Sequence, residues 1–208
     1  MEIVLDFDGT IIDASDRMYM LFKDIAPEFN FSKEEYWRLK RDKISHKKMF
    51  EEVGKNNEFK HFNAIWMDRI ETQKYLEYDK LYPDMDMNIK ILAEDNRLIL
   101  LTARQCEDKL KQELRRFDLE KYFSEILVAG GRTSKEELLK KFVLDHEIGN
   151  NIIYVSDMGQ DVFIGNKMGI KTIAVTYGFM SEKRLIEYNP DFIVRNIKSA
   201  VDIIMRGA

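Results

Sequence analysis

Short apolar runs that recur between charged, helix-periodic segments are the feature that most limits how this chain can fold. These runs occupy residues 3–5, 98–101, 126–128, 152–155 and 172–175. They lack the apolar/polar alternation of a half-exposed strand, as expected when helices cover both faces of a sheet. Strands separated by helices along the chain form parallel sheets. The pattern therefore predicts an α/β fold.

Helix boundaries can be read at several points. Ser32 and Ser134 each begin an S-x-x-E pattern, which is the capping box that opens a helix. Gly149 and Gly169 precede expected strands and are expected to end helices. The run 200–205 is expected to be an amphipathic helix that closes the core.

The segment 15–82 breaks this rhythm, because it holds aromatic-rich helical patterns and no convincing strand. We expect it to be an inserted helical bundle whose aromatic residues form its own core. Pro83-Asp84 marks the return to the sheet. The chain is therefore expected to divide into a core of residues 1–14 and 83–208 and a helical insert of residues 15–82.

The composition excludes several classes of protein. Hydrophobic residues make up 45% of the 208, enough for a sizeable core, and 33 basic residues against 37 acidic ones leave a net charge of -4. This balance indicates neither nucleic-acid nor membrane binding. The single cysteine, Cys106, favours a reducing compartment. No secretory signal is apparent at residues 1–5, and no apolar run approaches the ~20 residues that span a bilayer. We expect a soluble, cytoplasmic protein, with the oligomeric state left open.

Two carboxylates stand at the end of the first expected strand. Asp6 follows 3–5 directly, at the strand end where open α/β sheets place their ligand crevice, and Asp8 comes two residues later. Repulsion and desolvation would disfavour two bare carboxylates there, and a divalent cation resolves the conflict. Gly9 allows a tight turn that Thr10 could help to fix. The alternative is a purely structural turn.

Three other strand ends or helix starts carry polar side chains. Thr102 follows the run 98–101, and its hydroxyl can donate to a phosphoryl oxygen. Lys135 lies in a capping box, where backbone amides and the helix dipole already favour an anion. Asp157 follows the run 152–155, and Asp161 lies one helical turn later, a spacing that suits a metal ligand and its support. A capping role for Asp157 and a solvated position for Lys135 are the alternatives.

Other well-known sites are not supported. No segment has the P-loop spacing, the glycine after Asp6 is misplaced for an EF-hand, and Gly130-Gly131-Arg132 is expected to be only a turn. The three histidines lie in charged helical segments and are expected to be solvated or capping. A basic cluster at 40–47 includes Arg41, and we expect one or two of its members to contact an anionic substrate; a solvated helix face is the alternative.

The four elements together resemble the four motifs of the haloacid dehalogenase-like superfamily. The matching residues are Asp6-Phe7-Asp8-Gly9-Thr10, then Thr102, Lys135, and Asp157 with Asp161. The resemblance covers essentially the whole chain. It implies a Rossmann-like parallel core, and the helical insert is similar to the cap of the phosphoglycolate-phosphatase-like branch.

The resemblance also implies residue roles. Asp6 would attack phosphorus to form an aspartyl-phosphate, and Asp8 would protonate the leaving alcohol and then activate water. Mg²⁺ would be held by Asp6, by the backbone carbonyl of Asp8 and by Asp157, with Asp161 as a ligand or its support. Thr102 with Ala103, and Lys135, would hold the oxygens of the transferred group.

The chain departs from the family pattern in two places. Ser156 stands where the family commonly has glycine, and Lys135 lacks the proline that often follows the family lysine, which leaves Lys140 as an alternative. The acid at Asp8 disfavours dehalogenation, because dehalogenases of the superfamily lack it and need no metal. We therefore expect an Mg²⁺-dependent phosphatase of a small phosphorylated metabolite. A phosphosugar mutase and a non-catalytic phospholigand-binding protein are the alternatives.

Overall fold

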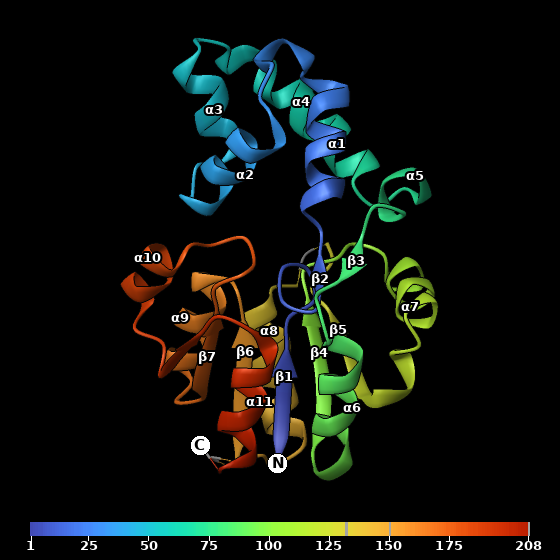
Figure 1. Cartoon of the computed structure of the whole chain (residues 1–208), viewed down its shortest axis with the longest axis vertical. Coiled ribbons are helices and arrows are strands. Elements are labelled where there is room, and N and C mark those ends of the chain that lie inside the picture. Colours follow the sequence, from blue (N-terminus) through green and yellow to red (C-terminus); the bar gives the residue numbers. More distant parts are fainter. Residues whose placement is uncertain (132, 150, 208) are drawn as a thin grey trace.

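The computed structural model describes residues 1–131, 133–149 and 151–207, so Arg132 of the expected turn lies outside the described residues. The chain forms a sheet unit and a helical unit that lies above one end of the sheet (Figure 1). Both chain ends lie at the opposite end of the sheet unit. Among the described residues, no helix is both long and apolar enough to span a bilayer.

The sheet has six parallel strands in the order β5-β4-β1-β6-β7-β8. Their bounds are β1 Glu2–Leu5, β4 Arg97–Thr102, β5 Phe123–Val128, β6 Ile152–Ser156, β7 Lys171–Val175 and β8 Phe192–Val194. The expected α/β fold is confirmed, and each expected strand is present. The short edge strand β8, which has three residues, was not expected.

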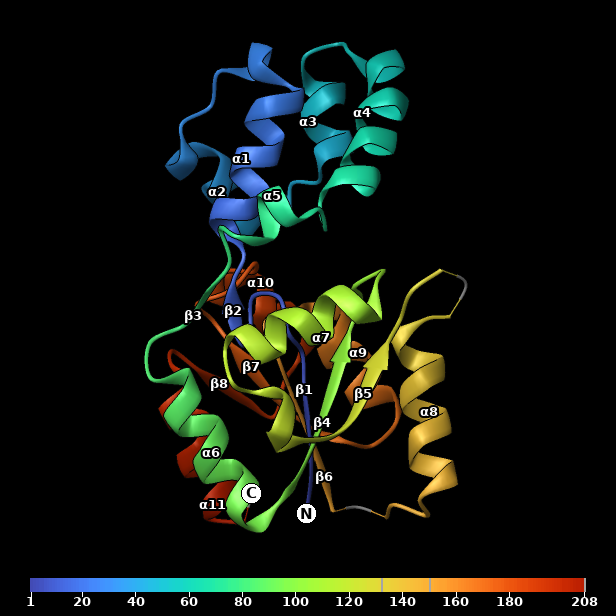
Figure 2. The same cartoon turned by 90° about the vertical axis from the view of Figure 1, so that its right-hand side faces the viewer.

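Helices cover both faces of the sheet, as the continuous apolar strands require (Figure 2). One face carries α6 Met85–Asp95, α7 Glu107–Arg116 and α11 Ile197–Met205, and the other carries α8 Lys135–Asp145 and α9 Gly159–Lys167. The short helix α10 Glu182–Leu185 and the 3₁₀ turns Glu120–Tyr122 and Ile186–Tyr188 complete this unit. The expected closing helix at 200–205 is the second half of α11.

The helix boundaries follow their predicted chemistry with one exception. Both expected capping boxes are present, with Ser32 before α2 and Ser134 before α8. Gly169 adopts a φ of 69° directly after α9 and its cap. The expectation for Gly149 was wrong, because α8 ends earlier and Glu147 takes the left-handed conformation there, with a φ of 51°.

The helical unit contains α1 Ser15–Ile25, α2 Lys33–Arg41, α3 His46–Glu52, α4 Asn56–Arg69 and α5 Gln73–Leu76, with a 3₁₀ turn at Pro27–Phe29. Its buried aromatic residues form a core of their own, separate from the two clusters that flank the sheet. His46 belongs to this core: its ring lies 4.3 Å from that of Trp66, and its Nε2 is 2.9 Å from the hydroxyl of Tyr36. The expectation of a solvated His46 was therefore wrong.

Two crossing segments join the units. Residues Ile12–Asp13 (β2) pair antiparallel with Lys80–Leu81 (β3), directly before α1 and directly after the last turn of the insert (Figure 1). The segment 15–82, expected to hold no strand, therefore ends in a strand of two residues. The sequence does not predict this pairing, because the paired residues lie 69 and 67 positions apart and each strand contributes only two residues.

Candidate active site

The centre of the sheet brings three of the sequence-predicted groups together. Asp6 directly follows the central strand β1, whose neighbours are β4 and β6. Thr102 is the last residue of β4, and Asp157 directly follows β6. Parallel strands end at the same edge, so these residues meet beneath the helical unit. All three are buried, with at most 4% of each residue exposed.

Lys135 joins two of the acids. Its Nζ donates to Oδ1 of Asp6 at 2.8 Å and to Oδ2 of Asp161 at 2.7 Å. Ser156 supports the same pair, because its hydroxyl donates to Asp161 at 2.7 Å and lies 3.5 Å from Oδ2 of Asp6. Lys140 is exposed and instead pairs with the half-buried Glu136 of α8. The structure thus places Lys135, and not Lys140, at Asp6.

The buried acids of this group share one cationic side chain, that of Lys135. Burial raises the pKa of Asp6 to about 7, against the pull of Lys135 and with a further push from Asp161. Burial and the nearby charge of Asp6 raise the pKa of Asp157 well above its ordinary value. Burial alone would lower the pKa of Lys135, but Asp161 and Asp6 raise it. The cluster therefore carries more potential negative charge than its lysine neutralises.

The turn after Asp6 closes tightly round Asp157. Gly9 has a φ of 85°, and a Cβ atom on it would lie 2.2 Å from Oδ2 of Asp157. A Cβ on Gly178 would meet the same oxygen at 2.2 Å. Thr10 holds the acid from its other side, donating to Oδ1 of Asp157 at 3.2 Å and accepting from its backbone N–H at 3.1 Å. Asp157 is thus fixed below the surface, where only glycine fits around it.

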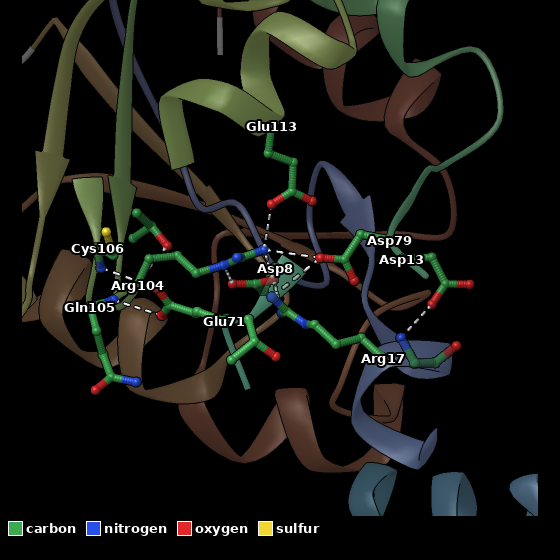
Figure 3. A network of polar contacts seen from close by, with 12 residues as sticks. Asp8, Asp13, Arg17, Glu71, Asp79, Arg104, Gln105, Cys106 and Glu113 are labelled. Carbon is green, nitrogen blue, oxygen red and sulfur yellow. Dashed lines mark hydrogen bonds and ion pairs between the residues drawn. The ribbon is translucent and has the colours of Figure 1, made fainter. Parts of the chain in front are cut away.

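Asp8 enters a buried network of ion pairs that crosses between the two units (Figure 3). Arg104 donates to both oxygens of Asp8, at 2.6 and 3.0 Å, and Arg17, on the first turn of α1, donates to Oδ1. Both guanidiniums also lie within 3.2 Å of Oδ2 of Asp79, and Arg104 lies 3.1 Å from Glu113 of α7. The two arginine side chains are 3–4% exposed.

This network sets the charge of Asp8. Burial alone would raise the pKa of Asp8, but Arg104 and Arg17 hold it down at about 2. Burial raises the pKa of Asp79 to about 8, despite the pull of Arg17. In this arrangement Asp8 is therefore ionised at neutral pH and is a proton acceptor.

A cavity of about 550 Å³ lies between the helical unit and this edge of the sheet. The predicted residues that line it are Asp6, Asp8, Thr102, Ala103, Lys135 and Asp161. Asp157 lies beneath the surface of the cavity. The structure does not bring Arg41 to it, because the Arg41 guanidinium donates to the backbone carbonyls of Gly178 at 2.6 Å and Thr176 at 2.8 Å.

A second contact between the units reaches the loop after Thr102. Glu71, which follows α4, accepts from the backbone N–H of Gln105 at 2.7 Å and of Cys106 at 3.0 Å (Figure 3). These are the last amides before α7, where a carboxylate is stabilised by the free N–H groups and the helix dipole. The helical unit thus caps a helix of the sheet unit.

The donors at the site are suited to a hard divalent cation. Among the described residues no three His, Cys, Asp or Glu side chains form a ready-made metal cluster. Asp6, Asp157 and Asp161 nevertheless offer only oxygen donors, and one lysine offsets them. Within the described part of the chain, Oδ2 of Asp6 has only the long 3.5 Å contact with Ser156. This excess of buried negative charge fits Mg²⁺, which prefers carboxylate and carbonyl oxygens.

The sequence prediction missed the ion pairs round Asp8. Arg104 could have been suspected, since it stands two residues beyond Thr102 at a strand end. Arg17 and Asp79 gave no such signal, because they lie next to the crossing strands β2 and β3 and meet only when these pair. No sequence signal pointed to Glu71 either, because its partners are backbone amides.

Comparisons with known proteins agree with this geometry. A sequence model of the haloacid dehalogenase-like hydrolase family matches residues 3–175. The chain is 22% identical to the pyrophosphatase PpaX of Halalkalibacterium halodurans over 97% of this chain and 95% of that protein. It is also 22% identical to a phosphoglycolate phosphatase of Synechococcus elongatus, over 98% of each chain.

A solved structure shares the fold. The haloacid dehalogenase-like family hydrolase from Streptococcus pneumoniae superposes with a TM-score of 0.82 at 17% identity, over 98% of this chain and 97% of that one. The match of the family over most of the chain and the shared fold lead to one conclusion. The chain is an enzyme of the haloacid dehalogenase-like hydrolase family.

Proposed function

We propose that the protein is an Mg²⁺-dependent phosphomonoester hydrolase that acts through an aspartyl-phosphate on Asp6. The observation that carries this proposal is the convergence of Asp6, Thr102 and Lys135 on one cavity. They provide a carboxylate nucleophile, a hydroxyl donor and a cation for the phosphoryl oxygens. Relatives named as phosphatases support it. The single Cys106 supports a cytoplasmic location.

In the first step a carboxylate oxygen of Asp6 forms a bond to phosphorus and the bond from phosphorus to the alcohol oxygen breaks. The departing oxygen takes a proton from Asp8. In the second step water attacks phosphorus, gives its proton to Asp8, and Asp6 leaves as a carboxylate. Asp6, Asp157 and the Asp8 carbonyl would hold Mg²⁺, with Asp161 in support, and the ion would offset charge on the phosphoryl oxygens.

Asp8 must gain a proton to serve as the acid, so the ion pairs described here have to loosen during the cycle. Arg17 lies at the base of α1, next to the crossing strand β2. Movement that withdraws Arg17 from Asp8 would weaken the cationic pull, so that burial would raise the pKa of Asp8 and favour its protonated form. We propose that residues 15–82 act as a mobile cap over the core formed by 1–14 and 83–208.

The test is phosphate release from a panel of phosphorylated metabolites with and without Mg²⁺, with product analysis that distinguishes free phosphate from a rearranged sugar phosphate. Asp6→Asn should abolish turnover. Lys135→Met should lower kcat/KM at least a hundredfold, because it removes the cation at the transferred group. Lys140→Met is the matched control on the outer face of the same helix and should behave like the parent. An active Asp6→Asn variant would refute the proposal.

A further inference from the structure

The part of the cavity that the helical unit covers is lined by apolar side chains. Met18 comes from α1, Trp66 and Met67 from α4, and Ile70 from the residue after α4, while Phe179 faces them from the sheet unit. We call these five residues the apolar wall. Trp66 is held in place by the core of the helical unit, because its ring packs against those of His46 and Phe62. The core of the helical unit therefore fixes the position of Trp66 in the wall.

The cations of the cavity are already paired. Arg17, Arg104 and Lys135 are the basic residues that line it, and each lies within 3.2 Å of at least two carboxylates. Lys135 is the cation that the proposed chemistry uses for the transferred phosphoryl group. Among the described residues that line the cavity, no further cation is therefore left for a second negative charge on the substrate.

The remaining polar groups of the cavity are suited to a neutral partner. Glu71 lies beside the apolar wall and would repel a second anion. Gln105 and Gln160 also line the cavity, and their amides can accept and donate hydrogen bonds without charge. Glu136 lines the cavity as well, so the leaving part of the substrate meets apolar surface, neutral amides and the two carboxylates of Glu71 and Glu136.

A neighbouring hollow of about 380 Å³ shares Met18, Gln160 and Phe179 with the cavity. Lys40 lines that hollow and has no acidic partner within the part of the chain that the structure describes. It does not line the cavity itself. Lys43 lines the same hollow and, like Lys40, does not line the cavity.

We infer that the site selects phosphomonoesters whose alcohol is bulky, uncharged and largely apolar, and that it disfavours compact substrates with a second anionic group, such as phosphoglycolate or pyrophosphate. This inference rests on the proposed phosphatase function. A cavity of this size lies within the roughly 300–1,000 Å³ of small-molecule sites, and a glycolate would leave the apolar wall in contact with water. A second compact anion would be desolvated without a counter-charge.

The experiment compares kcat/KM for 2-phenylethyl phosphate, ethyl phosphate, phosphoglycolate and pyrophosphate at one Mg²⁺ concentration. The two alkyl esters have leaving groups of similar quality, so their ratio measures contact with the wall. We expect 2-phenylethyl phosphate to exceed ethyl phosphate at least tenfold, and phosphoglycolate and pyrophosphate to fall below ethyl phosphate. Ile70→Ala should reduce the phenylethyl preference several-fold by shortening the wall.

A charge placed on the wall provides the reciprocal test. Met67, which is 47% exposed, should tolerate lysine, and Met67→Lys should raise the ratio of phosphoglycolate to ethyl phosphate turnover at least fivefold. Met87→Lys makes the same change at a 55% exposed methionine on α6, outside the cavity, and should leave that ratio unchanged.

The outcomes distinguish failure of the inferred substrate class from failure of the proposed phosphatase function. Hydrolysis of any of the three phosphomonoesters supports the phosphatase, and a parent enzyme that prefers phosphoglycolate or pyrophosphate overturns the substrate class alone. Equal effects of Met67→Lys and Met87→Lys would also overturn it, because the wall would then not contact the leaving group. Failure to hydrolyse all four compounds would overturn both.

Discussion

At the scale of single residues, Asp6 is placed under opposing demands. As the proposed nucleophile it must be ionised, whereas burial raises its pKa to about 7. Lys135 offsets part of that cost, and a bound cation would offset more. Ser156, which stands where the family commonly has glycine, uses its hydroxyl to hold Asp161 against Lys135. The serine is thus accommodated by its contacts with Asp161 and Asp6.

The raised pKa of Asp6 gives a stability prediction for the metal-free protein. Because the folded pKa of about 7 exceeds the unfolded value, the folded state binds more protons in between, and the free energy of unfolding falls as pH rises from about 4 to 7. Asp6→Asn replaces the carboxylate with a neutral amide, so the variant does not lose this stability as pH rises. At about pH 8 without Mg²⁺ the variant should be more stable than the parent, on the order of a few kcal/mol, in urea unfolding.

Mg²⁺ provides the control for that prediction. The parent should gain stability from Mg²⁺, since binding favours the folded state. The variant should gain much less, because the neutral amide of asparagine replaces a charged carboxylate ligand. Near pH 4 the parent and the variant should differ little. A parent that is more stable than Asp6→Asn at pH 8 in the absence of Mg²⁺ would contradict the burial of an uncompensated charge at this site.

At the scale of elements, the helical unit stabilises the loop that carries Thr102. Glu71 caps the N-terminus of α7 with both carboxylate oxygens, so the end of one helix in the sheet unit depends on a residue that follows α4. Arg104 in the same loop pairs with Asp8 and Asp79. The loop after β4 is therefore ordered by contacts from the crossing segment and the helical unit as well as from its own strand.

Glu71→Gln tests this dependence. The amide cannot accept from both N–H groups and has no charge to interact with the helix dipole, so the free energy of unfolding should fall by about 1 kcal/mol. KM should rise because the loop lines the cavity. Glu58→Gln, an exposed change in α4, is the matched control and should shift urea unfolding little. Equal effects of the two variants would show that the cap on α7 contributes nothing specific.

At the scale of the whole molecule, the two units form a closed arrangement held at both sides of the cavity. On one side Glu71 contacts the loop before α7, and on the other Arg41 contacts the loop after β7. The backbone N–H of Ser181 also donates to the carbonyl of Arg41 at 3.0 Å, and Trp37 packs against Phe179. The basic cluster of the insert thus supplies a contact between units through Arg41.

Arg41→Met tests whether this contact holds the units together. Loss of two hydrogen bonds from a charged donor should make separation of the units easier, so hydrogen exchange at the Ser181 amide should become about tenfold faster. Arg38→Met, an exposed change on the same helix, should leave that exchange unchanged. If Arg41→Met leaves the Ser181 amide as protected as in the parent, the contact is not what closes the molecule.

The sequence by itself determined what is local along the chain. Apolar runs, capping boxes and polar residues at strand ends follow from the period of side chains and the chemistry of free backbone groups. The sheet and the positions of Asp6, Thr102 and Asp157 at one edge of it could therefore be predicted. Tertiary structure decided the pairing of charges. Arg17 and Arg104 each pair with Asp8 and Asp79, and Arg41 donates to backbone carbonyls of the loop after β7. Such contacts depend on how the units pack, and they leave no periodic signal in the sequence.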